Sequence, residues 1–217
     1  MLVTLREILQ IAENRKIAVG AFNAANLESL QANVAAAEEL KVPMILQFAQ
    51  CHEEWIPLKL IGPLMVDFAK KASVPICVHL DHGETLDYLQ QARDFVEQTG
   101  IDALACSFGT THGIYLKQPK LDFDVVRRVR ELTGNIPVVM HGGSGVSSED
   151  FHRAIEAGVR KINYFTYMDK AGGNATAQYL GSLKEGEPIF FSSVIEAARE
   201  GMKENVKAAM KVFAKME

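Results

Sequence analysis

The 217-residue sequence lacks the features that mark membrane, secreted and nucleic-acid-binding proteins. No apolar run reaches the roughly 18 residues of a membrane span, and the opening MLVTLREILQ has no basic segment followed by an apolar core, as a signal peptide would. The three cysteines are widely spaced and form no CxxC pair, which argues against a disulfide scaffold or a zinc knuckle. With a net charge of −4, a broad basic face is not expected. These absences predict a cytoplasmic protein that binds neither nucleic acid nor membrane.

Motifs for nucleotides and for serine hydrolysis are also missing. The chain has no G-x-x-x-x-G-K-[ST] loop, no G-x-G-x-x-G turn and no G-x-S-x-G elbow. An anionic ligand must therefore be held by other local groups.

What the sequence does contain is an alternation of short apolar runs with longer amphipathic ones. The pattern predicts strands at 17–22, 42–48, 74–80, 101–107, 136–140 and 159–165, and helices at about 4–12, 26–40, 57–72, 85–99, 122–133, 147–158 and 193–214. The glycine-rich stretch 167–191 reads as less regular. This order predicts an α/β fold with a parallel sheet, either a (βα)8 barrel or an open doubly wound sheet. Six strands are too few for a standard barrel, which has eight.

Polar residues follow these strands, at the end where parallel α/β folds bind their ligands. His82, His112 and His141 each follow a different strand, at spacings that fit one βα unit, and three imidazoles with an open fourth position hold a catalytic zinc. Alternatively, each histidine is a polar residue at a strand end. His79 lies deeper in its strand. His52 and His152 have charged neighbours and are interpreted as surface residues without a role.

Two further groups follow the strands. Asp81 could act as a general base beside a cation, or orient a histidine. Gly142, Gly143 and Ser144 precede a helix, and Asn163 to Thr166 follow the next strand. The last two loops of a barrel commonly hold phosphate, and glycines let backbone N–H groups approach an anion.

Taken together, these motifs resemble the class II, metal-dependent ketose-bisphosphate aldolases, which cleave fructose or tagatose 1,6-bisphosphate. The matching stretches follow the family's order, and their combination is highly specific. They are 19–23 (VGAFN), 79–83 (HLDHG), 102–105 (DALA), 109–115 (GTTHGIY), 141–145 (HGGSG) and 161–163 (KIN).

The resemblance implies a TIM-type barrel that forms a single domain over 1–217. It implies one zinc ion per chain on His82, His112 and His141, with a monovalent cation as an optional addition. It implies Asp81 as the acid/base at the C4 hydroxyl while zinc stabilises the enediolate. It also implies contacts to a sugar phosphate, with dihydroxyacetone phosphate and glyceraldehyde 3-phosphate as products, and a homo-oligomer, dimer or tetramer. The residues that it assigns to the substrate and its phosphate are Asn23, Gly113, Gly142, Gly143, Ser144, Asn163 and Thr166.

The chain departs from the family near residues 91–92, where about two βα units are absent. Segment 86–91 resembles the helix before that region and 92–97 the helix after it. The lost part includes the loop whose glutamate exchanges the C3 proton in the family. Three explanations stay open: the protein is longer than this sequence, the units are truly deleted, or a second chain completes the barrel. Ala49 also replaces a serine common near the phosphate, and Tyr167 and Met168 replace an acidic residue that often follows the Asn-x-x-Thr stretch.

Two alternatives to the bisphosphate aldolase remain. One is a non-catalytic relative that binds zinc and sugar phosphate but lacks the proton-shuttle loop. The other is a metal-dependent lyase or epimerase acting on a different phosphorylated sugar.

Overall fold

The computed structural model describes the chain except residues 82–103, 106–107, 111–118, 133–134, 136 and 217. The expected helix at 85–99 and the join near 91–92 lie outside the described residues. The helices are α1 (Leu5–Arg15), α2 (Leu27–Leu40), α3 (Leu58–Lys71), α5 (Phe123–Leu132), α6 (Ser148–Ala157), α7 (Thr166–Ser182) and α8 (Phe191–Phe213), with a 3-10 turn η1 (Gln50–His52). The strands are β1 (Val19–Asn23), β2 (Met44–Phe48), β3 (Ile76–Leu80), β4 (Leu104–Ala105), β5 (Val138–Met140) and β6 (Val159–Tyr164).

The six strands form one parallel sheet in the order β3-β2-β1-β6-β5-β4. This confirms the α/β class and the parallel sheet that the sequence predicts. Within the described residues, β3 and β4 are the two edge strands. Segment 82–103, which lies outside the described residues, separates these two edge strands in the sequence.

The two faces of the sheet differ in what covers them. Alternate residues of a strand share a face. Phe22, Leu46 and Ile162 belong to the large apolar core that also includes residues of α2, α3, α6 and α8. On the other face, Ala21 and Ile45 pack with the buried side of α1, which covers the amino-terminal half of this face. Toward the carboxyl ends of the strands the same face carries the polar side chains Asn23, Gln47, His79 and Asn163, and Lys161 lies on this face beneath them, paired with Val19.

Helix α1 begins where its sequence predicts. The Thr4 side chain accepts a hydrogen bond from the backbone N–H of Glu7, and the Glu7 carboxylate accepts one from the Thr4 N–H, which completes a capping box. The helix continues to Arg15, three residues beyond the predicted end.

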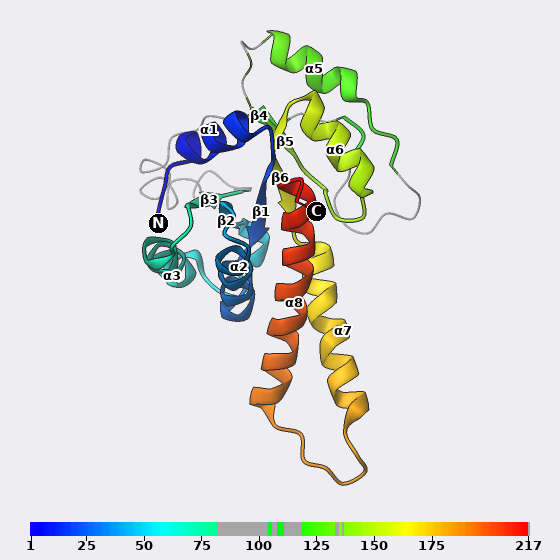
Figure 1. The fold of residues 1–217 in the computed structure, drawn as a ribbon. Coiled ribbons are helices and arrows are strands. Elements are labelled where there is room, and N and C mark those ends of the chain that lie inside the picture. The colour runs from blue at the N-terminus through cyan, green and yellow to red at the C-terminus, as the bar shows by residue number, and fades with distance from the viewer. Residues whose placement is uncertain (82–103, 106–107, 111–118, 133–134, 136, 217) are drawn as a thin grey trace.

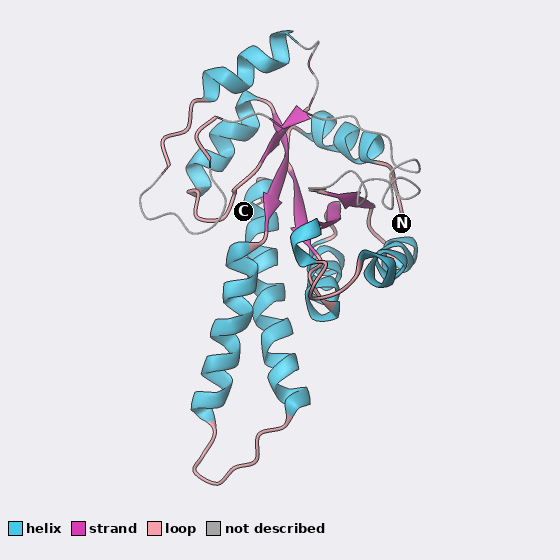
Figure 2. Cartoon of the chain, turned by 180° about the vertical axis from the view of Figure 1, so that it is seen from behind, coloured by secondary structure: helices cyan, strands magenta, loops and turns pink. Residues whose placement is uncertain are grey.

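Two expectations for the carboxyl-terminal region were wrong. Residues 166–182 form the regular helix α7, and α8 begins at Phe191, so Ser193 lies inside α8 and does not cap it. Glycines there serve close packing: a Cβ on Gly172 would come within 2.9 Å of Met202 Cγ, and one on Gly201 within 2.5 Å of Ala175 Cβ. The two helices form a hairpin that extends away from the sheet (Figures 1 and 2).

Candidate active site

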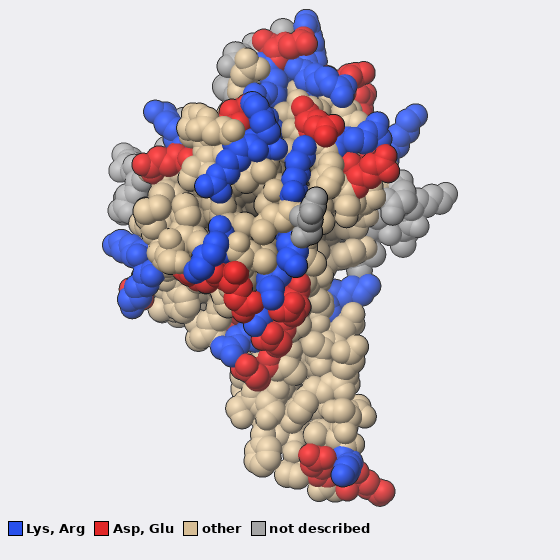
Figure 3. Space-filling model, viewed as in Figure 1, with Lys and Arg blue, Asp and Glu red and all other residues tan. Residues whose placement is uncertain are grey.

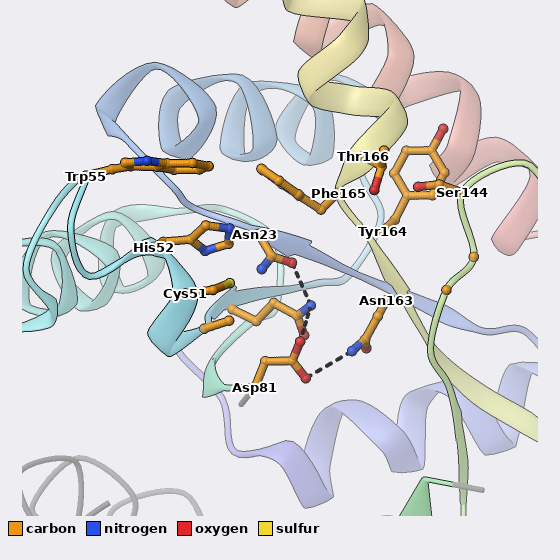
Figure 4. A pocket seen from close by; sticks show the side chains of 14 residues that line it. Asn23, Cys51, His52, Trp55, Asp81, Ser144, Asn163, Tyr164, Phe165 and Thr166 are labelled. Carbon is orange, nitrogen blue, oxygen red and sulfur yellow. Dashed lines mark hydrogen bonds between the residues drawn. The ribbon is translucent and has the colours of Figure 1, made fainter. Parts of the chain in front are cut away.

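A cavity of about 370 Å³ lies at the carboxyl ends of β1, β2, β3, β5 and β6. Most of the predicted site residues that the structure describes line it: Asn23, Asp81, Gly142, Gly143, Ser144, Asn163 and Thr166. In Figure 4, Asn23, Asp81 and Asn163 point toward one another from separate strands, and Ser144 and Thr166 lie together at another side of the pocket. His82, His112 and Gly113 lie outside the described residues.

Asp81 is held at the base of this cavity. Its backbone N–H donates to the Phe48 carbonyl at 2.7 Å, which fixes the start of the loop after β3. Its carboxylate accepts a hydrogen bond from Asn163 Nδ2 at 3.0 Å and one from Gln47 Nε2 at 3.3 Å (Figure 4). Because each oxygen accepts a hydrogen bond from one N–H donor, the carboxylate is held in a fixed orientation.

His141 follows β5 and lies beside Asp81. Its Nε2 is 3.9 Å from Asp81 Oδ1, and Asn163 Nδ2 lies 3.2 Å from Nδ1 and 3.3 Å from Nε2. No set of three histidine, cysteine, aspartate or glutamate side chains within the described ranges is placed to hold a metal. His141 is nevertheless an imidazole at the site, and His82 directly follows Asp81 in the sequence, so the donor types fit zinc.

Another part of the cavity wall consists of the glycine-rich loop after β5 and the start of α7. Gly142 has φ +66° and turns the chain out of β5, and a Cβ on Gly143 would come within 2.9 Å of the Asn163 carbonyl oxygen. Ser144 is buried, and its Oγ accepts a hydrogen bond from the Tyr167 N–H at 3.4 Å. The first turn of α7, beginning at Thr166, borders the same space. A helix amino terminus beside a glycine-rich loop favours bound phosphate.

The interpretation of His52 as a surface residue was wrong. Its side chain is 3% exposed and lines the cavity. The ring lies among Phe48, Trp55 and Phe165, with centroid distances of 5.9, 5.2 and 4.9 Å. Burial lowers the pKa of His52, although the negative charges of Asp169 and Asp81 act to raise it. His52, Trp55 and Phe165 thus give the cavity a wall of aromatic rings.

Sequence reasoning also missed Gln47 and Lys161. Both side chains are buried, on the face of the sheet that α1 partly covers. The Lys161 ammonium donates to Gln47 Oε1 at 3.0 Å and to Asn163 Oδ1. A signal was present for Gln47, the single polar residue of the otherwise apolar strand β2. For Lys161 the signal was its position two residues before Asn163, which places both on the same face of β6.

Comparison with known proteins identifies the class of the fold and site. The family description "Fructose-bisphosphate aldolase class-II" matches residues 3–94 and 88–217. The chain belongs to the class II fructose-bisphosphate aldolase family.

Individual relatives agree with this assignment. The chain is 27% identical to the protein YdjI of Escherichia coli K12 over 279 aligned positions, covering 98% of each. A crystal structure described as the YdjI aldolase of E. coli K12 superposes with a TM-score of 0.83, covering 98% of this chain and 97% of that one. The fructose-bisphosphate aldolase of Campylobacter jejuni, 17% identical, superposes with a TM-score of 0.80 over 98% of this chain and 95% of its own, which supports the fold. No helix among the described residues is long and apolar enough to cross a membrane.

Proposed function

We propose that the chain is a zinc-dependent aldolase that cleaves fructose or tagatose 1,6-bisphosphate to dihydroxyacetone phosphate and glyceraldehyde 3-phosphate. The observation that carries this proposal is the position of Asp81. Its carboxylate is hydrogen-bonded from two sides, lies next to His141, and shares one cavity with the Gly142–Ser144 loop and Thr166. A base, a metal-ligating side chain and an anion site thus surround one space.

In the cleavage direction, Asp81 accepts the proton of the C4 hydroxyl. As the O–H electrons form the C4 carbonyl, the C3–C4 bond breaks and its electron pair moves onto the dihydroxyacetone phosphate half. The carboxylate of Asp81 becomes a carboxylic acid, and an aldehyde is released. The remaining half then takes up a proton at C3 from water to give dihydroxyacetone phosphate, and the hydroxide that this leaves takes the proton back from Asp81. Asn163 and Gln47 hold the carboxylate so that proton transfer needs little reorganisation.

The phosphate of the dihydroxyacetone half would lie against Gly142, Gly143, Ser144 and Thr166. Backbone N–H groups of the loop and of the first turn of α7 would supply its hydrogen bonds. Asn163 and Asn23 line the same cavity and would bind the sugar oxygens. Gly113, which the resemblance adds to this set, lies outside the described residues.

His82, His112 and His141 would hold the zinc ion. When bound, zinc acts as a Lewis acid that polarises the C2 carbonyl and stabilises the negative charge that develops there. The role of this chain is to present His141 beside Asp81, within reach of the same substrate. A monovalent cation remains an optional addition to this proposal.

We also propose that two βα units of the family barrel are absent between β3 and β4. The family matches in two pieces that meet at residues 88–94, the region of the predicted join. About 213 residues of this chain (98% of 217) are spread over 279 aligned positions with YdjI, so the relative has residues where this chain has none. The two sheet edges also flank this region, which supports the same explanation.

We further propose that the protein forms a homo-oligomer through the end of the α7–α8 hairpin. Figure 3 shows charges of both signs over the body and over the part of the hairpin nearest to it, and farther out the visible side of the hairpin is largely uncharged except at its end. There, Ile189, Phe190 and Phe191 are 64%, 59% and 77% exposed. Contiguous exposed apolar side chains of this size mark contact surfaces, and a second copy of this chain is the proposed occupant. A cytoplasmic location stays a prediction.

The Asp81→Ala variant tests the proposed function. Cleavage of fructose and tagatose bisphosphate should fall about 100- to 10,000-fold, because the general base is lost. Zinc bound per chain should not change. The matched control is Asp67→Ala on α3, where the exposed carboxylate pairs with Lys71, and this variant should keep full activity. Full cleavage by Asp81→Ala would contradict the assignment of the base.

A further inference from the structure

Lys161 is a buried cation beneath the cavity, and the chemistry described so far gives it no role. Its side chain is 1% exposed and lies on the inner face of β6, two residues before Asn163. Lys161 is not among the described residues that line the cavity. Burying an ammonium group costs free energy unless its protons are paired, so a buried lysine at this position calls for an explanation.

The hydrogen bonds of Lys161 determine which way two amides face. An ammonium group has three donors and no acceptor. Because it donates to Gln47 Oε1 and to Asn163 Oδ1, both amide oxygens point toward Lys161. Both NH2 groups must then point away from the cation, and both donate to the carboxylate of Asp81, one to each oxygen.

The Asn23 amide extends this arrangement. Gln47 Nε2 also donates to Asn23 Oδ1 at 2.8 Å. The register of the sheet explains the spacing, since Asn23 pairs with Gln47 across β1 and β2, and Val19 pairs with Lys161 across β1 and β6. The lysine therefore stands one layer below Asn163 and two layers below Gln47 and Asn23, and the Gln47 and Asn163 amides connect it to the carboxylate.

We propose that Lys161 is a positioning residue that orients the Gln47 and Asn163 amides so that both present N–H donors to Asp81. This inference rests on the proposed function, in which Asp81 carries the proton. Without the ammonium group, either amide can turn by 180° about its terminal bond. It would then present a carbonyl oxygen to the carboxylate, and the base would lose a donor and face a repulsive dipole.

A different role for Lys161, as a nucleophile, does not fit the geometry. Burial lowers the pKa of Lys161 to about 8, although the negative charge of Asp81 acts to raise it. A lowered pKa is a property of lysines that form Schiff bases. However, its Nζ is hydrogen-bonded to Gln47 and Asn163 and lies outside the cavity lining, so a substrate carbonyl cannot reach it. Borohydride added during turnover should therefore trap no adduct on this chain.

The first arm of the test compares steady-state kinetics of the wild type and Lys161→Met, which keeps the side-chain length and removes the charge. We expect kcat to fall about 10- to 100-fold, the range seen when supporting partners of a site are removed. KM should stay within about twofold, and zinc per chain should be unchanged. The control Lys71→Met removes an exposed lysine of α3 and should keep wild-type kinetics.

Gln47→Met separates positioning from a general effect on the fold. It should lower kcat in the same direction, and the double variant with Lys161→Met should lose less than the product of the two single losses, because both act on one carboxylate. Independent, multiplicative losses would overturn the proposal. If Lys161→Met does not fold, the Gln47→Met variant alone tests the proposal. An unchanged kcat in Gln47→Met would contradict the role of the Gln47 amide in holding Asp81.

A second readout does not depend on activity. The side-chain NH2 signals of Gln47, assigned in a 15N NMR spectrum through Gln47→Met, should exchange slowly with solvent in the wild type and shift and exchange faster in Lys161→Met. A wild type that cleaves no bisphosphate, but whose Gln47 signals depend on Lys161, would refute the proposed function while supporting the positioning. A wild type that cleaves, with a Lys161→Met variant that keeps kcat, would overturn the positioning and leave the proposed function intact.

Discussion

At the scale of the residue, Glu13 shows how single ion pairs stabilise the end of the sheet opposite the site. Its carboxylate contacts Lys16 at 2.7 Å, Arg160 Nε at 2.8 Å and Arg130 at 3.1 Å. Burial raises the pKa of Glu13, but hydrogen bonds from these cations outweigh it and lower the pKa to about 2. Arg160 is itself buried, so Glu13 neutralises a charge that water does not reach.

This pairing predicts an acid-dependent loss of stability. Since the folded-state pKa is depressed, the contribution of Glu13 is fully present above its usual pKa of 4.5 and is lost as pH falls toward about 2. The contribution at neutral pH should be about 3 kcal/mol. Glu13→Gln should lower the free energy of unfolding by about that amount at pH 7 and by much less at pH 2.

Urea unfolding of Glu13→Gln and the wild type, followed at pH 7 and at low pH, measures this difference. The control is Glu131→Gln, whose carboxylate is exposed and pairs only at the surface with Arg128. That variant should change stability by less than about 1 kcal/mol at either pH. Equal losses for the two glutamates at pH 7 would contradict the account of Glu13.

At the scale of the element, α8 is fastened to the sheet at one end only. Phe213, in its last turn, is 1% exposed and contacts the rings of Phe22, Phe151 and Tyr164 at centroid distances of 6.4, 4.9 and 5.9 Å. Phe191, in its first turn, is 77% exposed. The same helix therefore offers a buried and an exposed phenylalanine for comparison.

Phe213→Ala should lower the free energy of unfolding by about 3–5 kcal/mol, because it leaves a cavity among the aromatic rings. Phe191→Ala should cost less than about 0.5 kcal/mol in the monomer. Thermal unfolding of both variants at equal protein concentration makes the comparison. A similar melting temperature for the two would mean that α8 does not dock as described.

At this scale, sequence patterns correctly predict the helices and strands that have a simple hydrophobic period. They fail for helices that depend on close packing against another helix. The βα alternation and the start of the first helix were predicted correctly because their signals are local. The stretch 167–191 was expected to be less regular because its glycines weaken a helix in isolation. In the fold, Gly172 and Gly201 let α7 and α8 approach each other, and no local pattern reveals that gain.

The residues of the candidate site also fall into those that sequence patterns predict and those that they do not. Asp81, Asn163, Gly142 to Ser144 and Thr166 could be predicted to converge, because the carboxyl ends of parallel strands meet at one edge. Gln47 and Lys161 were missed because their hydrogen bond joins two strands far apart in the sequence, β2 and β6, and no local pattern reveals it. His52 was misjudged from its acidic sequence neighbours, since the turn η1 directs its ring inward against Phe48 and Phe165.

At the scale of the whole molecule, the exposed hairpin end predicts assembly. Light scattering after size-exclusion chromatography should give a mass of two or four times 23.9 kDa. The combined change Phe190→Ser and Phe191→Ser should shift it toward one chain, because the apolar contact is removed. Leu60→Ser, which changes an exposed residue of α3, should leave the mass unaltered. A single-chain mass for the wild type would refute the proposed oligomer.

The central claim concerns a zinc-dependent bond cleavage, and one measurement tests it most directly. Purified protein is supplied with zinc and with fructose or tagatose 1,6-bisphosphate, and release of dihydroxyacetone phosphate is followed before EDTA, after EDTA and after zinc is restored. The account predicts release from one of the two sugars, its loss with EDTA and its return with zinc. Release that is unaffected by EDTA, or bound sugar phosphate with no release from either sugar, would contradict it.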